Sequence, residues 1–170
     1  MDDLRLRESL SLDGQLTFTV FDEEQNIVDQ WTGHNVICNA GLAIFCGAVA
    51  WSGIQDQAAA LGLSTSGSYL TPLYGAIGTG TTTPTANDTQ LTTEVARSTV
   101  AGASGSVNQV LFTFFFSTVS FAGAVAEAGV FCNATPTINT GYLLDHVLIS
   151  PTVAKTSSQT ATLQFQLTFS

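Results

Sequence analysis

The sequence is short of positive charge. Its 170 residues include four Lys and Arg against 13 Asp and Glu, which gives a formal net charge of −9. Proteins that bind DNA or RNA generally through phosphates need a basic surface, so this composition argues against nucleic acid as a partner. Charged residues of either sign make up only 10% of the chain, against roughly 25% in an average soluble protein. Because sparse charge limits the solubility of a free monomer, we expect much of the surface to face partners.

Long apolar runs are also missing. No stretch approaches the roughly 20 apolar residues that span a bilayer, and the opening Met-Asp-Asp is unlike a secretory signal peptide. We therefore expect neither a membrane partner nor secretion. With 45% hydrophobic residues, the chain can still bury a sizeable core, and its length suits a single domain.

The chain lacks the patterns of metal centres and active sites. His34 and His146 are far apart in sequence, and no His, Cys or carboxylate cluster has ligand spacing, so we expect no metal and no cofactor. His146 shares one face of an expected strand with Leu144 and Leu148, which favours a structural role. There is no G-x-S-x-G motif and no suitable carboxylate pair. We therefore expect no enzyme.

Two further features have ordinary structural explanations. Cys38, Cys46 and Cys132 are odd in number and widely spaced, so we expect free, buried thiols. The glycines of residues 75–80 resemble a phosphate-binding loop but lack its Lys-Ser/Thr and a following helix. They are more typical of a tight turn at a strand end.

The first 32 residues predict an acidic β-hairpin or meander. Leucines alternate over residues 4–12, Leu16, Phe18 and Val20 alternate after Asp13-Gly14, and Asp-Gly is a strong hairpin signal. Residues 22–26 predict a second turn, and residues 27–31 a third strand. Residues 1–30 hold eight acids and two bases, −6 of the total charge. Two alternatives stay open for 1–32: an arm that packs on a neighbouring subunit, or an extension of the subunit's own sheet.

Residues 33–170 predict a β-sandwich domain with one helix. Asn39 is a good N-cap before an Ala-rich, apolar run, so we expect a short buried helix near residues 40–50. Strand-like segments follow at short intervals, and the clearest alternates Leu163, Phe165 and Leu167 with polar residues. The fold class is therefore all-β: a β-sandwich or jelly roll.

Glu94 and Arg97 lie three residues apart in a region with few charges. One interpretation is a surface pair of little energetic value. The other is an ion-pair cluster of Glu94, Arg97 and Glu127, formed within the subunit or between subunits.

Four segments resemble a diffuse family of tailed-bacteriophage virion proteins. They are Trp31-Thr-Gly-His-Asn-Val-Ile-Cys-Asn-Ala-Gly-Leu42, the Gly/Thr-rich residues 74–97, Ala126-Glu-Ala-Gly-Val-Phe131 and residues 144–155, which end in Lys155. An alternating strand at residues 162–169 closes the domain as in family members. The resemblance implies a virion structural protein that is assembled in the host cytoplasm.

What the resemblance implies about position and partners is less specific. Because 170 residues leave no room for a shaft or a separate tip, we expect a head decoration (cement) subunit that binds a virion lattice. A tail, neck or baseplate fibre-associated adaptor is the alternative. The expected partners are other copies of the chain, as a trimer, and major capsid or tail proteins. A glycan-binding, lectin-like module is a further alternative, for which the candidate stacking residues are Trp31, Trp51, Tyr69, Tyr74 and Tyr142.

Overall fold

The computed structural model describes residues 11–49 and 73–170, and it describes side chains for residues 11–44 and 73–170. These residues form nine strands and one helix, so the all-β prediction is confirmed. Among them, no helix has the length and apolarity to cross a membrane. The elements are β1 (Leu12–Phe21), β2 (Ile27–His34), β3 (Val36–Ile37), α1 (Asn39–Val49), β4 (Tyr74–Gly78), β5 (Glu94–Gly105), β6 (Gln109–Phe116), β7 (Gly123–Cys132), β8 (Tyr142–Lys155) and β9 (Thr160–Phe169).

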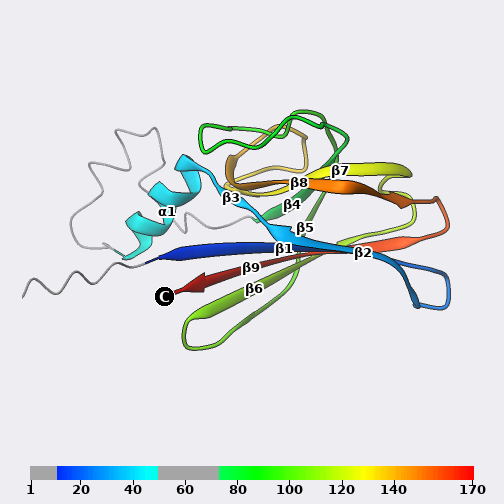
Figure 1. The fold of residues 1–170 in the computed structure, drawn as a ribbon, viewed down its shortest axis with the longest axis horizontal. Coiled ribbons are helices and arrows are strands. Elements are labelled where there is room, and N and C mark those ends of the chain that lie inside the picture. Colours follow the sequence, from blue (N-terminus) through cyan, green and yellow to red (C-terminus); the bar gives the residue numbers. More distant parts are fainter. Residues whose placement is uncertain (1–10, 50–72) are drawn as a thin grey trace, which may run out of the picture.

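The strands form two layers joined through β5 (Figure 1). The hydrogen-bonded order is β2-β1-β9-β6-β5-β4-β7-β8-β3, and each pair of neighbouring strands is antiparallel. Residues 94–99 of β5 pair with β4, whereas residues 100–105 pair with β6. We name the layer β2-β1-β9-β6-β5 sheet A and the layer β5-β4-β7-β8-β3 sheet B. The Trp31 indole of β2 donates to the Ser150 carbonyl of β8 at 3.2 Å, so the sandwich is nearly closed on its other side.

The main core lies between the two sheets and follows the period-two pattern of the strands. In β9, Leu163, Phe165 and Leu167 have no exposed surface, while the intervening Gln164 and Gln166 are partly exposed, as the alternation predicts. Full burial of one such side chain contributes on the order of 2 kcal/mol. Other core residues with no exposed surface are Leu16, Phe18, Val20, Ile77, Phe114, Phe116, Val125, Ala128 and Val130.

The prediction of a hairpin turn at Asp13-Gly14 is wrong. Both residues lie within β1, where they pair with Thr168 and Leu167 of β9. The hairpin instead turns at residues 22–26, where the Asn26 amide donates to the Asp22 carboxylate at 2.8 Å. The long, complementary strand β9 continues the ladder through the Asp-Gly pair, so tertiary pairing overrides the local turn signal. The strand expected at residues 4–10 lies outside the described residues.

Strand β1 is an interior strand of sheet A. It is hydrogen-bonded to β2 on one side and to β9 on the other. Its Leu16, Phe18 and Val20 side chains belong to the main core. Residues 12–32 therefore lie in the same two-layer unit as residues 73–170, which is the arrangement of a sheet extension.

Helix α1 forms where the sequence predicts it and packs on β8. A Cβ placed on Gly41 would lie 2.2 Å from the Leu144 carbonyl oxygen, so only glycine permits this close approach. Gly41 and Ile44 are buried, but Leu42 is 48% exposed. The expectation of a helix buried on all sides is therefore corrected to burial on one side for its described side chains. The side chain of Cys46 lies outside the described residues.

Candidate functional site

Sheet B buries side chains on both faces. Along β7, Ala128 and Val130 face the main core, and alternation turns Glu127 and Phe131 to the opposite face. Two loops, residues 79–93 and 133–141, lie over that outer face (Figure 1). Beneath them is a second apolar cluster, made of Cys38, Tyr74, Ala76, Leu91, Phe131, Ala134 and Leu143.

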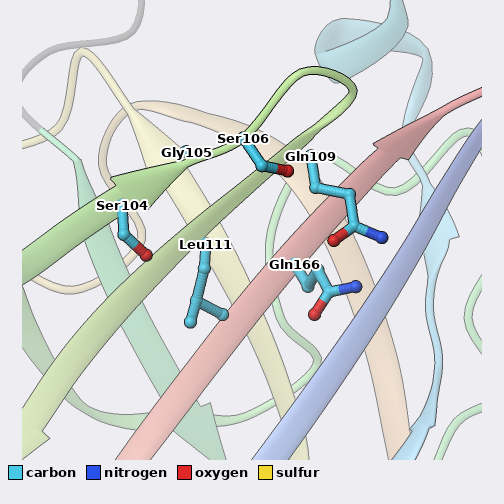
Figure 2. A pocket seen from close by; sticks show the side chains of 6 residues that line it. All are labelled: Ser104, Gly105, Ser106, Gln109, Leu111 and Gln166. Carbon is cyan, nitrogen blue, oxygen red and sulfur yellow. The ribbon is translucent and has the colours of Figure 1, made fainter.

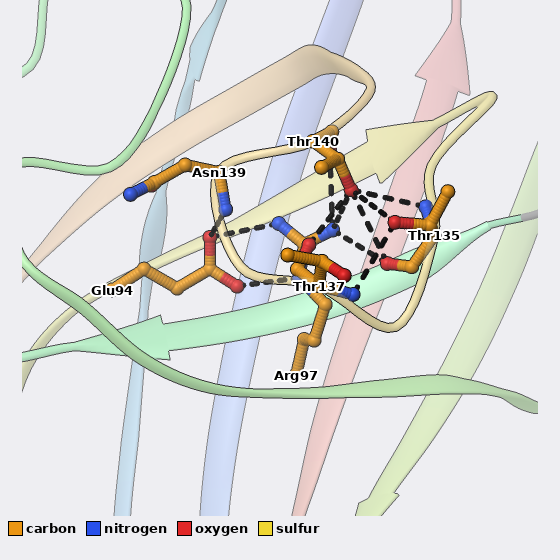
Figure 3. A network of polar contacts seen from close by, with 6 residues as sticks. All are labelled: Glu94, Arg97, Thr135, Thr137, Asn139 and Thr140. Atoms are coloured by element: carbon orange, nitrogen blue, oxygen red, sulfur yellow. Dashed lines mark hydrogen bonds and ion pairs between the residues drawn. The ribbon is translucent and has the colours of Figure 1, made fainter.

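Glu94 and Arg97 form a buried ion pair on this outer face (Figure 3). The guanidinium donates from Nε to Oε1 at 2.6 Å and from Nη2 to Oε2 at 2.8 Å, a bidentate geometry. Residues three apart point to opposite faces of a regular strand. The β4–β5 register shifts next to Glu94, between Ile77 and Gly78, and this irregularity lets the two side chains meet.

The same arginine holds the loop of residues 133–141. Its Nη1 donates to the Thr135 carbonyl at 2.9 Å and to the Thr140 carbonyl at 3.1 Å. The Glu94 carboxylate accepts the Asn139 amide at 2.9 Å, and Asn139 has a φ of 57°. The guanidinium carbon lies 4.8 Å from the centre of the Phe131 ring, a cation–π distance. The pair therefore fastens one loop to sheet B.

Glu127 fastens the other loop. Its Oε1 accepts the Gly80 amide at 3.0 Å and the Thr93 amide at 2.6 Å, and its Oε2 accepts the Thr92 amide at 3.0 Å. One buried carboxylate thus binds both ends of loop 79–93. A Cβ on Gly80 would lie 2.5 Å from Glu127 Oε1. This glycine, which the sequence assigns to a tight turn, therefore makes room for the carboxylate.

His146 completes the Glu127 cluster from the neighbouring strand. Its Nε2 lies 3.0 Å from Glu127 Oε2 and its Nδ1 lies 2.7 Å from Asp88 Oδ2. Burial alone would lower the pKa of His146, but its hydrogen bonds to the two carboxylates and their charges raise it above the usual value. Both nitrogens can then donate, as an imidazolium does.

The pKa values of the two carboxylates, Glu127 and Asp88, shift in the opposite direction to that of His146. Burial acts to raise the pKa of Glu127, but hydrogen bonds from His146 and from the Thr93, Thr92 and Gly80 amides lower it below the usual value. The pKa of Asp88 is also lowered, because hydrogen bonds from Thr85 and His146 outweigh desolvation. The pKa shifts of all three groups therefore favour their charged forms.

Asp145 lies next to this cluster at a break in the β7–β8 ladder. The register shifts between Val130 and Phe131, and the Val130 amide donates to Asp145 Oδ1 at 2.8 Å. Asn35 Nδ2 donates to Oδ2 at 2.6 Å. Burial raises the pKa of Asp145 to about 7, while these two hydrogen bonds and the charge of His146 act to lower it.

Lys155 is a buried cation held by backbone carbonyls. Its Nζ donates to Phe121 O at 2.7 Å and to Thr118 O and Thr156 O at 3.3 Å. Burial lowers its pKa. The ammonium thus ties the segment that connects β6 to β7 to the end of β8.

The structure brings Glu94 and Arg97 together but places Glu127 in the separate cluster with His146 and Asp88. His146 is buried, as expected for a structural residue, but its two ion-pair partners were not expected. The sequence signal for the contact between Glu127 and His146 is that each lies as a polar residue within an apolar segment, Val-Ala-Glu-Ala-Gly and Leu-Asp-His-Val. Finding the contact requires the β7–β8 register, which pairs Gly129 with His146.

These groups hold loops, and most of them are shielded from solvent. The side chains of Glu94, Arg97, Glu127 and His146 are at most 2% exposed. Among the described residues, no group of three or more His, Cys, Asp and Glu side chains could hold a metal ion. Cys38 and Cys132 are free and buried, and burial raises the pKa of each thiol to about 12.

A shallow depression lies elsewhere, on the outer face of sheet A (Figure 2). Its volume is about 220 Å³, and its lining combines polar and apolar surface. It contains hydrogen-bonding groups but no ionisable side chain. The lining residues are Ser104, Gly105, Ser106, Gln109, Leu111 and Gln166.

The described aromatic residues that were considered for glycan stacking do not line this depression. Tyr74 is 8% exposed and lies beneath Arg97, and Trp31 packs against the main core. Tyr142 is half-buried and also packs against that core. Trp51 and Tyr69 lie outside the described residues.

Charge is distributed unevenly over the surface. In residues 73–170, every ionisable Asp, Glu, Arg, His and Lys side chain is buried or hydrogen-bonded to a buried group. Apart from Asp88, which is 25% exposed and bonded to His146, the exposed or half-exposed acids of the described residues lie on β1, β2 and their turn: Asp13, Asp22, Glu23, Glu24 and Asp29. The surface of residues 73–170 therefore carries little side-chain charge.

The comparisons with models of protein families, with curated proteins and with solved structures each find no match to this chain.

Proposed function

We propose that this protein is a structural subunit of a tailed-bacteriophage virion, and that it decorates the head by binding the capsid lattice. The observation that carries the proposal is the charge distribution: the surface of residues 73–170 offers hydroxyls, amides and backbone but no unpartnered charge. Such a surface is poorly suited to a free monomer and well suited to contact with neighbouring subunits.

The buried ion pairs support the same proposal. Arg97 and Glu127 each fasten a loop to sheet B by several hydrogen bonds. Loops held in this way present a fixed shape, which lowers the entropy cost of ordering them in an assembly. The resemblance of four segments to virion proteins, in order and spacing, points to the kind of assembly.

The proposal assigns no catalytic role to the chain. The ionisable side chains of residues 73–170 are engaged in buried contacts, and none lines the depression on sheet A. Hydrolysis of a host polysaccharide would require carboxylates that reach the substrate.

Cryo-electron microscopy of the virions, with immunogold labelling of this chain, tests the proposal. We expect labelling at regular positions on the head. Labelling on the tail, neck or baseplate would support the adaptor alternative, and absence of the chain from purified virions would contradict a virion role. A glycan array probed with the isolated protein tests the lectin-like alternative. That alternative requires specific binding to a glycan.

A further inference from the structure

The second half of β5 is an open edge of sheet A. Residues 94–99 have β4 as a neighbour, but among the described residues 100–105 pair with β6 alone. The Val100 amide still donates to the Leu73 carbonyl at 3.2 Å, so the open edge begins after Val100. Residues 99–105 are all exposed. The β5–β6 hairpin that contains this edge projects at one end of the sandwich (Figures 1 and 2).

The direction of the backbone groups follows from the hairpin turn. The Ser106 amide donates to the Gln109 carbonyl at 2.9 Å, so residue 106 faces β6. Hydrogen-bonding directions alternate along an antiparallel ladder. The amide and carbonyl of Ser104 therefore face β6, and those of Ala103 and Gly105 point away from it.

Within the described part of the chain, this edge has none of the features that usually block strand addition. Monomeric β proteins protect their edges with charges, prolines or covering segments. Residues 100–105 are Val-Ala-Gly-Ala-Ser-Gly, without charge or proline. A Cβ added at Gly102 would meet no atom within 4 Å. Small side chains and open space allow another strand to approach closely.

We propose that the edge of residues 101–105 pairs with the same edge of a second copy of this chain, antiparallel and about a two-fold axis near Ala103. The two copies of sheet A then form one continuous sheet. A strand that pairs with itself in this way has isologous symmetry, so the closed product is a dimer. This differs from the trimer expected from the sequence, and it requires no virion protein, so its test is independent of the proposed function.

The positions of the acids favour a second copy at this edge. The exposed acids of the described residues lie on β1, β2 and their turn, at the opposite edge of sheet A. Four strand spacings, about 19 Å, separate β2 from β5, which exceeds the Debye length of about 8 Å at physiological ionic strength. Pairing through β5 therefore keeps the acids of two copies apart, whereas pairing through β2 would bring them together.

Two exposed valines fit the same geometry. Val107 is 105% exposed and Val100 is 37% exposed, at opposite ends of the edge. Antiparallel pairing about Ala103 places Ser106 opposite Val100 of the second copy, with Val107 beside it. At each end of the paired edge, the valine of one copy thus covers apolar surface of the other. The edge contact is small compared with a standard interface of about 1,600 Å², so we expect a dimer that depends on concentration.

Backbone amide exchange and sedimentation velocity of the full chain test the pairing, from about 10 µM to 1 mM. We expect dimer to increase with concentration and the Ala103 and Gly105 amides to become protected, while β2 amides do not. Ala103→Pro removes a donor that points away from β6, so it should abolish the dimer and leave the fold intact. Ala103→Ser retains the donor and should retain the dimer.

A matched pair of lysine variants separates the two edges of the sheet. Ser104→Lys places like charges near each other across the proposed axis and should weaken dimerisation at least tenfold. Thr32→Lys adds the same charge to β2 and should leave dimerisation unchanged. A protein that stays monomeric at 1 mM, or a dimer that Ala103→Pro and Ser104→Lys leave intact, would overturn the proposal. Protection of the edge only after addition of a capsid lattice would also overturn it.

Discussion

Asp145 is the described side chain whose charge is least compatible with its surroundings. It is completely buried and accepts hydrogen bonds from uncharged donors. Its folded pKa of about 7 lies above the usual 3.8, so the folded state binds the proton more tightly. Stability from this group therefore falls as the pH rises from about 4 to about 7.

The Asp88–His146–Glu127 cluster adds two further pH effects. The raised pKa of His146 means that its stabilisation is complete below about pH 6.5 and is lost as the pH rises through the folded value. The lowered pKa values of Asp88 and Glu127 give stabilisation above about pH 4.5 that is lost in stronger acid. We therefore expect maximum stability near pH 5.

Asp145→Asn should reduce this pH dependence and preserve the fold. The side-chain oxygen of the new residue can still accept the Val130 amide. Its amide can donate to Asn35 Oδ1, which is buried and has no hydrogen-bond partner, if the Asn35 amide turns over. We expect the variant to be more stable than the parent at pH 7.5 by about 1 kcal/mol, or 2–4 °C in Tm.

Thermal unfolding of both proteins at pH 5.5 and 7.5 checks this prediction. The parent should lose stability between the two pH values, and the variant should lose less, with the remaining change due to His146. Equal losses in the two proteins would show that Asp145 does not titrate in this range.

At the scale of the element, the loop of residues 133–141 depends on the Glu94–Arg97 pair. Arg97→Met should destabilise the protein by about 3–5 kcal/mol, because it leaves the buried Glu94 carboxylate without its partner. The double variant Glu94→Gln/Arg97→Met should recover part of that loss, since no charge then remains buried. Urea unfolding of the single and double variants measures both values. A loss of stability below about 1 kcal/mol for Arg97→Met would show that the pair contributes no more than an exposed surface salt bridge.

Loop 79–93 depends on Glu127 in the same way. Glu127→Gln replaces an acceptor with an N–H donor among three backbone amides, so we expect a loss of about 2–4 kcal/mol. Amide exchange at Thr92 and Thr93 should accelerate. Asp88→Asn is the matched control, because Asp88 is 25% exposed and hydrogen-bonds to His146 and Thr85, and its effect on the two amides should be smaller. Unchanged exchange in Glu127→Gln would remove Glu127 from its role as a loop anchor.

At the scale of the whole molecule, the acidic N-terminal strands are part of the fold as well as the main source of exposed charge. Deletion of residues 1–30 removes all of β1, with three fully buried core side chains, and leaves one edge of β9 without a partner. If residues 1–32 were an arm that packs on a neighbouring subunit, such a truncation would leave a folded core. The structure predicts instead that the truncated chain does not fold.

Circular dichroism and solubility of the truncated chain measure this outcome. Deletion of residues 1–10 is the matched control, since it keeps β1 complete, and this chain should retain a cooperative unfolding transition. A folded, soluble chain that lacks residues 1–30 would show that the remaining strands form an independent unit.

Local patterns in the sequence determine much of this protein. The period-two alternation of Leu163, Phe165 and Leu167 is a property of the strand itself, so β9 and its buried face are predictable without a partner. The helix at Asn39–Val49 is likewise predicted by composition. Because these signals depend on neighbours within a few residues, the all-β class and the helix position follow from the sequence.

Only the tertiary structure decides which distant residues meet. Asp13-Gly14 has the local signal of a turn, but ten residues of pairing with β9 hold it in a strand. The contact between Glu127 and His146 depends on the β7–β8 register, and the Glu94–Arg97 pair on an irregularity in β5. Strand register and bulges arise from packing across the whole sandwich, so a shift of one residue would turn these side chains to the other face. Period and composition therefore determine the elements, and long-range pairing determines the clusters that hold the loops.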